Sequence, residues 1–161
     1  MIYLSEEVTL NVMIIILQEG NSEFEYIDLW SSKFTWGGMS PPGKGELAII
    51  TKGQHIYFDA VSTPVLKGII IQEGSLIFDD NQDVSLDVEY LLILDGGKLQ
   101  IGTEDMPFQH NVVVTMHGHV KSIELPIFGS KVIGLREGSI DMHGSSVGVT
   151  WTHLDLTSLK G

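Results

Sequence analysis

Apolar residues follow a ten-residue pattern that returns several times along the chain. A short apolar strand leads to a two-residue polar corner and a glycine, and apolar residues stand two and four places beyond that glycine. Segments 69–78, 92–101 and 133–142 follow the pattern closely, and segments 49–58 and 113–122 follow it more loosely. Their glycines are separated by 21, 23, 21 and 20 residues and are Gly53, Gly74, Gly97, Gly118 and Gly138. A period near twenty residues with two strands per unit is typical of a solenoid.

This spacing predicts an all-β fold, a short parallel β-helix of about five turns with capped ends. Because side chains alternate between the two faces of a strand, one apolar pair per turn is expected to point inward. The inward pairs are Leu76 with Phe78, Leu99 with Ile101, and Ile140 with Met142. In the first turn the pair is either Ile56 with Phe58 or His55 with Tyr57, since a slip of one residue exchanges the faces. Each of the five glycines is expected to turn a corner with positive φ.

A β-sandwich of about ten short antiparallel strands is the alternative, because strand and turn signals also alternate in that fold. Residues 1–29 do not follow the repeat and are interpreted as a cap or as the junction with an upstream domain, with the repeat domain at 30–161. The stretches 60–67, 79–88, 103–111 and 121–131 are expected to be loops between strands. Large aromatic residues are expected to seal the ends of the core; they are Trp30, Trp36 and Trp151.

Composition narrows the function classes. The chain has 161 residues, enough for one domain, and 9 basic against 21 acidic residues give a net charge of −12. Nucleic acid and anionic membranes are therefore unsuitable partners, because binding phosphates needs a basic surface. There is no cysteine and hence no disulfide framework or thiolate site. No apolar segment is long enough for a membrane span.

No catalytic motif is present, and we assign no catalytic, cofactor-binding or metal-binding residue. Glycoside hydrolysis needs two carboxyl groups some 5–10 Å apart, and spacing does not single out a pair among Asp59, Glu104, Asp105 and Asp141. His117 and His119 flank Gly118, with His110 nearby, so a histidine metal site is one reading. Hydrogen bonding of these rings to loop backbone is the other.

The acidic run Asp79-Asp-Asn-Gln-Asp83 offers the oxygen ligands that calcium prefers. It lacks the glycine and glutamate positions of an EF-hand loop. A solvated acidic loop is the favoured interpretation, with calcium as the alternative.

Several phrases together resemble one extracellular family, the eight-glycine (G8) domain found in fibrocystin, fibrocystin-L and cell-surface or secreted hyaluronidases. The phrases cover about residues 30–161 and include Trp36-Gly-Gly, Gly74-Ser-Leu-Ile-Phe-Asp79, Gly96-Gly-Lys-Leu-Gln-Ile-Gly-Thr-Glu104, Gly138-Ser-Ile-Asp-Met-His-Gly144 and Val149-Thr-Trp-Thr-His-Leu154. The stretch Pro107-Phe-Gln-His-Asn111 is more similar to the fibrocystin branch, and within it to fibrocystin-L.

The resemblance implies a β-rich module on the outer side of the plasma membrane, within a large single-pass protein. Two functions follow as hypotheses. The first is a non-catalytic module for ligand recognition, adhesion or spacing, with a protein or glycan ligand. The second is hyaluronan binding or a part in hyaluronan degradation, which the net charge disfavours unless cations gather on one face. The cations in question are Lys44, Lys52, Lys67, Lys98, Lys121 and Lys131.

Overall fold

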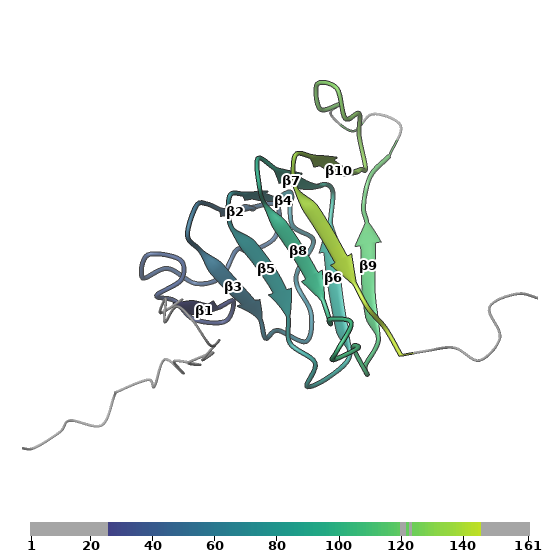
Figure 1. Ribbon diagram of the computed structural model, residues 1–161. Coiled ribbons are helices and arrows are strands. Elements are labelled where there is room, and N and C mark those ends of the chain that lie inside the picture. The colour runs from purple at the N-terminus through teal and green to yellow at the C-terminus, as the bar shows by residue number, and fades with distance from the viewer. Residues whose placement is uncertain (1–25, 120–121, 123, 146–161) are drawn as a thin grey trace, which may run out of the picture.

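The computed structural model describes residues 26–119, 122 and 124–145, and within them the fold consists of strands and loops without a helix (Figure 1). The strands are β1 Ile27–Leu29, β2 Leu47–Ile50, β3 His55–Phe58, β4 Gly68–Gln72, β5 Ser75–Phe78, β6 Val84–Val88, β7 Leu91–Leu94, β8 Lys98–Ile101, β9 Val112–Met116, β10 Ile133–Arg136 and β11 Ser139–Met142.

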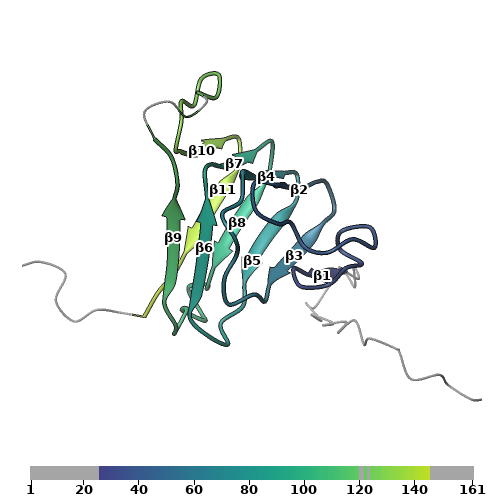
Figure 2. The same cartoon turned by 180° about the vertical axis from the view of Figure 1, so that it is seen from behind.

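These strands form three parallel sheets. Sheet A has the order β1-β3-β5-β8-β11, sheet B has the order β10-β7-β4-β2, and sheet C pairs β6 with β9. The chain visits them in turn, since β4, β5 and β6 belong to sheets B, A and C, and β7, β8 and β9 repeat that order. Figure 2 shows sheet C from the side on which β6 and β9 lie in front of sheet A. Every pairing between named strands is parallel, so the antiparallel sandwich was the wrong alternative.

The core consists of apolar columns that run across the sheets. In sheet A, Ile56 pairs with Leu76 and Leu76 with Leu99, and all three are at most 1% exposed. Phe58 pairs with Phe78, which confirms Ile56 and Phe58 as the inward pair of the first turn. Sheets B and C add buried columns from alternate positions of their strands, as the side-chain period of two requires; they include Ala48, Ile69, Leu91, Ile50, Ile71, Ile93, Val84, Leu86 and Val88.

Three of the repeated glycines lie at corners between sheets B and A. Positive φ is not the reason why glycine is needed there. Positive φ falls on the residue before each of them, at Glu73 (54°), Gly96 (85°) and Glu137 (54°). The glycines themselves are required by contact with the neighbouring turn. A Cβ on Gly97 would stand 2.3 Å from the carbonyl oxygen of Ile71, and one on Gly138 would stand 2.8 Å from that of Gly97. Gly74, Gly97 and Gly138 therefore form one column across sheet A, where any side chain would meet the adjacent backbone.

The other two repeated glycines lie elsewhere. Gly53 (φ 77°) stands one place earlier in its corner, in register with the positive-φ residue Glu73, while Gln54 is in register with Gly74. Gly118 follows β9 in sheet C and packs near the side chain of Lys131, so it belongs to a different corner. Four corners between sheets B and A are present among the described residues, where the sequence predicted about five turns.

The third sheet was missed by the sequence analysis. Segment 79–88 was predicted to be a loop, yet it contains β6, and segment 60–67 joins the same layer through the bridges Ser62–Ser85 and Leu66–Val88. The chain thus passes through three straight segments before the order of the sheets repeats, and the segment in sheet C follows a connection that differs in length between β5–β6 and β8–β9.

Aromatic residues close the end of the core beside β1 and β3. Trp30 is 3% exposed, and its ring centroid lies 5.0 Å from that of Trp36 and 4.9 Å from that of Phe58. The indole Nε1 of Trp36 donates a hydrogen bond to the carbonyl oxygen of Trp30 at 2.7 Å. The predicted sealing role is confirmed for these two tryptophans, and Trp151 lies outside the described residues, as does most of the predicted junction segment 1–29.

Candidate functional site

Three polar side chains form a column at the corner where the chain passes from sheet C to sheet B. Leu66 bridges Val88, and Val88 pairs with Met116, so the residues that follow them come into register on successive turns. These residues are Lys67, Glu89 and His117. Backbone hydrogen bonds from Glu89 N to Leu66 O (3.1 Å) and from His117 N to Val88 O (2.8 Å) fix the column. The scaffold therefore presents an ammonium, a carboxylate and an imidazole side by side.

A hollow of about 170 Å³ opens beside this column. Part of its wall comes from the corner residues and part from the long connection between β9 and β10, which projects beyond sheet B in both views (Figures 1 and 2). The lining residues are Lys67, Glu89, Tyr90, His117, Ser122, Leu125 and Lys131. Ammonium, imidazole, carboxylate and hydroxyl groups thus converge next to one aromatic ring and one aliphatic side chain. Convergence of polar groups beside an aromatic ring is one feature of small-molecule sites.

The ring of Tyr90 owes its place to Gly68, the first residue of β4. A Cβ on Gly68 would stand 2.3 Å from Cε2 of the Tyr90 ring, so only glycine leaves room for the ring at this point. Nearby, Phe128 of the β9–β10 connection lies over Gly134 and Leu92 on the outer side of sheet B. A short antiparallel bridge between Leu125 and Gly129 closes the loop that carries it. The wall opposite the column is therefore anchored on the sheet.

The charges around the hollow are partly paired. Lys67 Nζ lies 2.5 Å from Glu89 Oε2, with about a third of each side chain exposed. His117 Nε2 lies 2.6 Å from Asp87 Oδ1 on β6, and Ser85 Oγ donates to the other oxygen of that carboxylate at 3.2 Å. Within the described part of the chain, Lys131 has no carboxylate within ion-pair distance. Lys131 is thus the cation lining the hollow whose charge is not balanced by a described carboxylate.

The histidines do not gather into one metal site. His110 precedes β9 and His117 follows it, so the length of the strand separates them by roughly 20 Å at about 3.3 Å per residue. His110 Nδ1 contacts Asp80 Oδ1 at 2.8 Å and His117 contacts Asp87, while His119 N donates to Ser122 Oγ at 2.9 Å. Among the described residues no group of three His, Cys, Asp or Glu side chains is placed to hold a metal ion.

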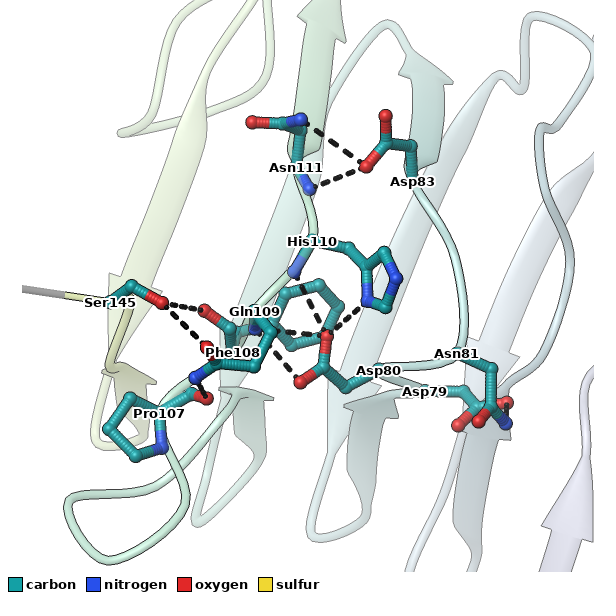
Figure 3. A network of polar contacts seen from close by, with 10 residues as sticks. All are labelled: Asp79, Asp80, Asn81, Asp83, Pro107, Phe108, Gln109, His110, Asn111 and Ser145. Carbon is teal, nitrogen blue, oxygen red and sulfur yellow. Dashed lines mark hydrogen bonds and ion pairs between the residues drawn. The ribbon is translucent and has the colours of Figure 1, made fainter.

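The acidic run 79–83 joins the segment before β6 to the segment before β9, as Figure 3 shows. Both oxygens of Asp80 accept the backbone N–H of Gln109, at 3.0 and 2.9 Å, and Oδ1 also accepts that of His110 at 3.1 Å. Asp83 Oδ1 accepts the backbone N–H of Asn111 at 2.8 Å. These carboxylates therefore position the segment that leads into β9, and calcium binding stays a prediction.

The same contacts shift the pKa values of the groups involved. Burial acts to raise the pKa of Asp80, but hydrogen bonds from the His110 ring and from backbone N–H groups outweigh it and hold the pKa below its usual range. The backbone and side-chain hydrogen bonds of Asn111 lower the pKa of Asp83. The hydrogen bond to Asp80 raises the pKa of His110. The network is thus arranged to favour charged Asp80 next to charged His110.

Two of the carboxylates considered for glycoside hydrolysis, Asp59 and Asp141, lie too far apart to act as a pair. Asp59 follows β3 and accepts hydrogen bonds from the backbone N–H of Ser31 (2.8 Å) and from its hydroxyl (2.5 Å). Asp141 on β11 contacts His143 Nε2 at 2.7 Å, and β5 and β8 lie between β3 and β11. Three strand spacings are about 14 Å, beyond the 5–10 Å that the reaction needs. Glu104 and Asp105 are exposed in the loop after β8.

The lysines do not form a continuous basic face among the described residues. Lys52 pairs with Glu73 at 2.8 Å near the corner between sheets B and A, and Lys98 lies 3.7 Å from Asp141 on sheet A. Lys67 and Lys131 both line the hollow. Lys121 lies outside the described residues. Lys52 and Lys98 are therefore paired at places other than the hollow.

The site itself was not predicted from the sequence, because it belongs to the sheet that the repeat did not reveal. A usable signal was present. The alternating apolar residues Val84, Leu86 and Val88 are followed by Glu89, and Val112, Val114 and Met116 are followed by His117. Aligning these two segments would have placed the two polar residues in one column.

A family model defines the class of protein to which the fold and site belong. The G8 domain model matches residues 35–155, which lie within the predicted domain 30–161, and the chain is a member of the G8 domain family. The resemblance drawn from the sequence is thereby confirmed. No solved structure matches the chain.

Among particular proteins, the chain is 55% identical to human Fibrocystin-L over 141 residues, which cover 88% of this chain and 3% of that protein. It is 33% identical to mouse Fibrocystin over 89% of this chain and 4% of that protein. It is also 32% identical to the mouse "Cell migration-inducing and hyaluronan-binding protein" over 62% of this chain and 8% of that protein. The chain thus spans a small fraction of the length of these relatives. No helix in the part of the chain that the structure describes is long and apolar enough to cross a bilayer.

Proposed function

We propose that this chain is a glycan-recognising, non-catalytic module in the extracellular part of a large cell-surface protein. We further propose that sheets B, A and C are successive faces of one parallel β-helix. The regular visiting order of the sheets and the parallel pairings support the coil. The similarity to Fibrocystin-L and to a hyaluronan-binding protein supports the extracellular setting and the class of ligand.

The observation that carries the ligand-recognition role is the hollow between the Lys67–Glu89–His117 column and the β9–β10 connection. Polar groups that converge beside an aromatic ring on a rigid sheet corner are suited to a sugar. Hydroxyl groups bond to the polar groups, and the C–H face of the sugar packs on the ring. A catalytic role is disfavoured because Asp59 and Asp141 lie too far apart and each is already held by a neighbour.

The test is a binding screen of the 161-residue chain against immobilised extracellular glycans, both acidic and neutral, with a parallel assay for new reducing ends. We expect retention of at least one class of glycan and no release of reducing ends over hours. Failure to bind any glycan would remove the recognition role. Steady glycan cleavage would remove the non-catalytic one.

Participation in hyaluronan degradation is the second candidate, and it rests on the 31% identity to a zebrafish "Cell surface hyaluronidase" over 70% of this chain. The reducing-end assay with hyaluronan decides it. If the double variant Asp59→Asn, Asp141→Asn released reducing ends from hyaluronan at an unchanged rate, neither carboxylate would act in such a reaction.

A further inference from the structure

We propose that the hollow at Lys67, Tyr90 and Lys131 binds one carboxylated sugar ring at the end of a glycan. This inference rests on the proposed glycan recognition and adds the chemical class of the ligand and the residues that hold it. The ring lies against Tyr90, and its carboxylate is bound by Lys131.

The size of the hollow matches a single sugar. At about 30 Å³ for each water, a hollow of about 170 Å³ holds five or six waters. It is therefore a small site, with room for one sugar ring and not for several. A second ring of the same chain would have to lie outside this volume. The site is therefore suited to a terminal unit.

The apolar part of the wall favours a sugar over a simple anion. The Tyr90 ring packs against Gly68, and Leu125 of the β9–β10 connection lines the same hollow. Carbohydrate rings have C–H faces that pack against aromatic and aliphatic surfaces. A sulfate or phosphate ion has no such face and would leave Tyr90 and Leu125 without a contact.

The unbalanced positive charge at the hollow favours a ligand that carries a carboxylate. Lys67 is partly neutralised by Glu89 at 2.5 Å, and the His117 ring is held by Asp87 at 2.6 Å. Lys131 is the ammonium at the hollow whose charge no described carboxylate balances. A ligand carboxylate beside Lys131 would complete the balance through a charge-assisted hydrogen bond. Ser122 and Glu89 remain to bond to ring hydroxyls.

The surface around the hollow argues against a long polyanion. The chain carries a net charge of −12, and Lys52 and Lys98 are paired with Glu73 and Asp141 on other parts of the fold. Salt screens such charges beyond about 8 Å at physiological ionic strength, which is the scale of one or two sugar rings. One terminal carboxylate therefore escapes most of the repulsion that a chain of them would meet.

The test compares three probes by NMR titration of the 161-residue chain: a disaccharide with a terminal glucuronic acid, the same disaccharide with terminal glucose, and sodium sulfate. We expect the acidic disaccharide to bind roughly tenfold or more tightly than the neutral one, as loss of a charge-assisted hydrogen bond implies. Sulfate is expected to bind weakly or not at all. Equal affinity for the two disaccharides, or tighter binding of sulfate, would overturn the proposal.

Variants locate the site. Lys131→Asn suits the positive φ of 54° at this position and removes the charge, and we expect it to weaken binding of the acidic disaccharide roughly tenfold. Lys131→Arg should retain most of the affinity. Lys52→Ala, which removes a lysine at another corner, is the matched control and should leave affinity unchanged. If Lys131→Asn binds like the unmodified chain, the hollow is not the site, although glycan recognition stands. If no glycan binds at all, the proposed function falls with it.

Discussion

His110 Nδ1 and Asp80 Oδ1 lie 2.8 Å apart and join two successive turns of the chain at the start of β9. Asp80 comes thirty residues before His110 and also accepts the backbone N–H groups of Gln109 and His110. One carboxylate thus fixes both the side chain and the backbone of the next turn (Figure 3).

This pair should make stability depend on pH. The raised pKa of His110 means that its contribution is fully present below the unfolded value near 6.5 and is lost as pH rises through the folded value. The lowered pKa of Asp80 means that its contribution is present above about 4 and is lost as pH falls through the folded value. The two windows overlap between roughly pH 4 and pH 6.5.

We expect His110→Gln to lower the melting temperature more at pH 5.5 than at pH 8.5, in thermal unfolding followed by circular dichroism. The pairs His117–Asp87 and His143–Asp141 are present in both proteins, so they do not contribute to the difference between them. A difference that is the same at both pH values would contradict the assigned role of the ion pair.

The two adjacent glycines of one corner should respond differently to alanine. Gly97→Ala would place its Cβ 2.3 Å from the Ile71 carbonyl oxygen, so we expect a loss of about 2–3 kcal/mol in the free energy of unfolding. Gly96→Ala meets no atom within 4 Å but has φ of 85°, and should cost about 1–2 kcal/mol. Urea unfolding measures both, with Gly144→Ala as the unstrained control. A larger cost at Gly96 would show that φ, and not contact, dictates the glycine column.

Removing the aromatic cap should destabilise the whole domain. Trp30→Ala deletes a ring that is 3% exposed and packs against Phe58, so we expect a loss of about 3–5 kcal/mol. Phe34→Ala in the same loop removes a ring that is 59% exposed and should change stability by less than about 0.5 kcal/mol. Urea unfolding of the two variants gives the comparison. Similar losses would mean that Trp30 does not seal the core.

Calcium should have little effect on stability if the carboxylates of the acidic run only hydrogen-bond to the segment before β9. Asp80 and Asp83 already accept backbone N–H groups, so we expect the same melting temperature in 1 mM calcium and in excess chelator. A calcium-dependent rise in melting temperature that Asp79→Asn abolishes would instead establish an ion site, because a ligand that binds only the folded state stabilises it.

The sequence contained enough to predict parallel strands with an aliphatic interior, and not enough to predict the site. The period of two placed Leu76 and Leu99 correctly, because their phrases are alike around Gly74 and Gly97. Gly118 matched the same spacing by coincidence, since its phrase belongs to sheet C. Regular spacing therefore identified most corners but could not tell one kind from another.

The column of Lys67, Glu89 and His117 was hidden for a physical reason. The residues are 22 and 28 positions apart, because the loops that lead into sheet C differ in length between turns. Loops tolerate such differences while strands do not. Only the hydrogen-bond register of Leu66, Val88 and Met116 brings the three side chains together.

The chain leaves the scaffold after His117 and returns at Val132, whose carbonyl accepts the backbone N–H of Leu91 before β10 continues sheet B. The points of departure and return are set by neighbouring turns, whatever the length of the connection between them. An insertion at this place can be exchanged, lengthened or shortened without disturbing the buried columns. Members of the family could thus diversify what they recognise by editing a single surface segment, while inheriting the stability of the stack beneath it.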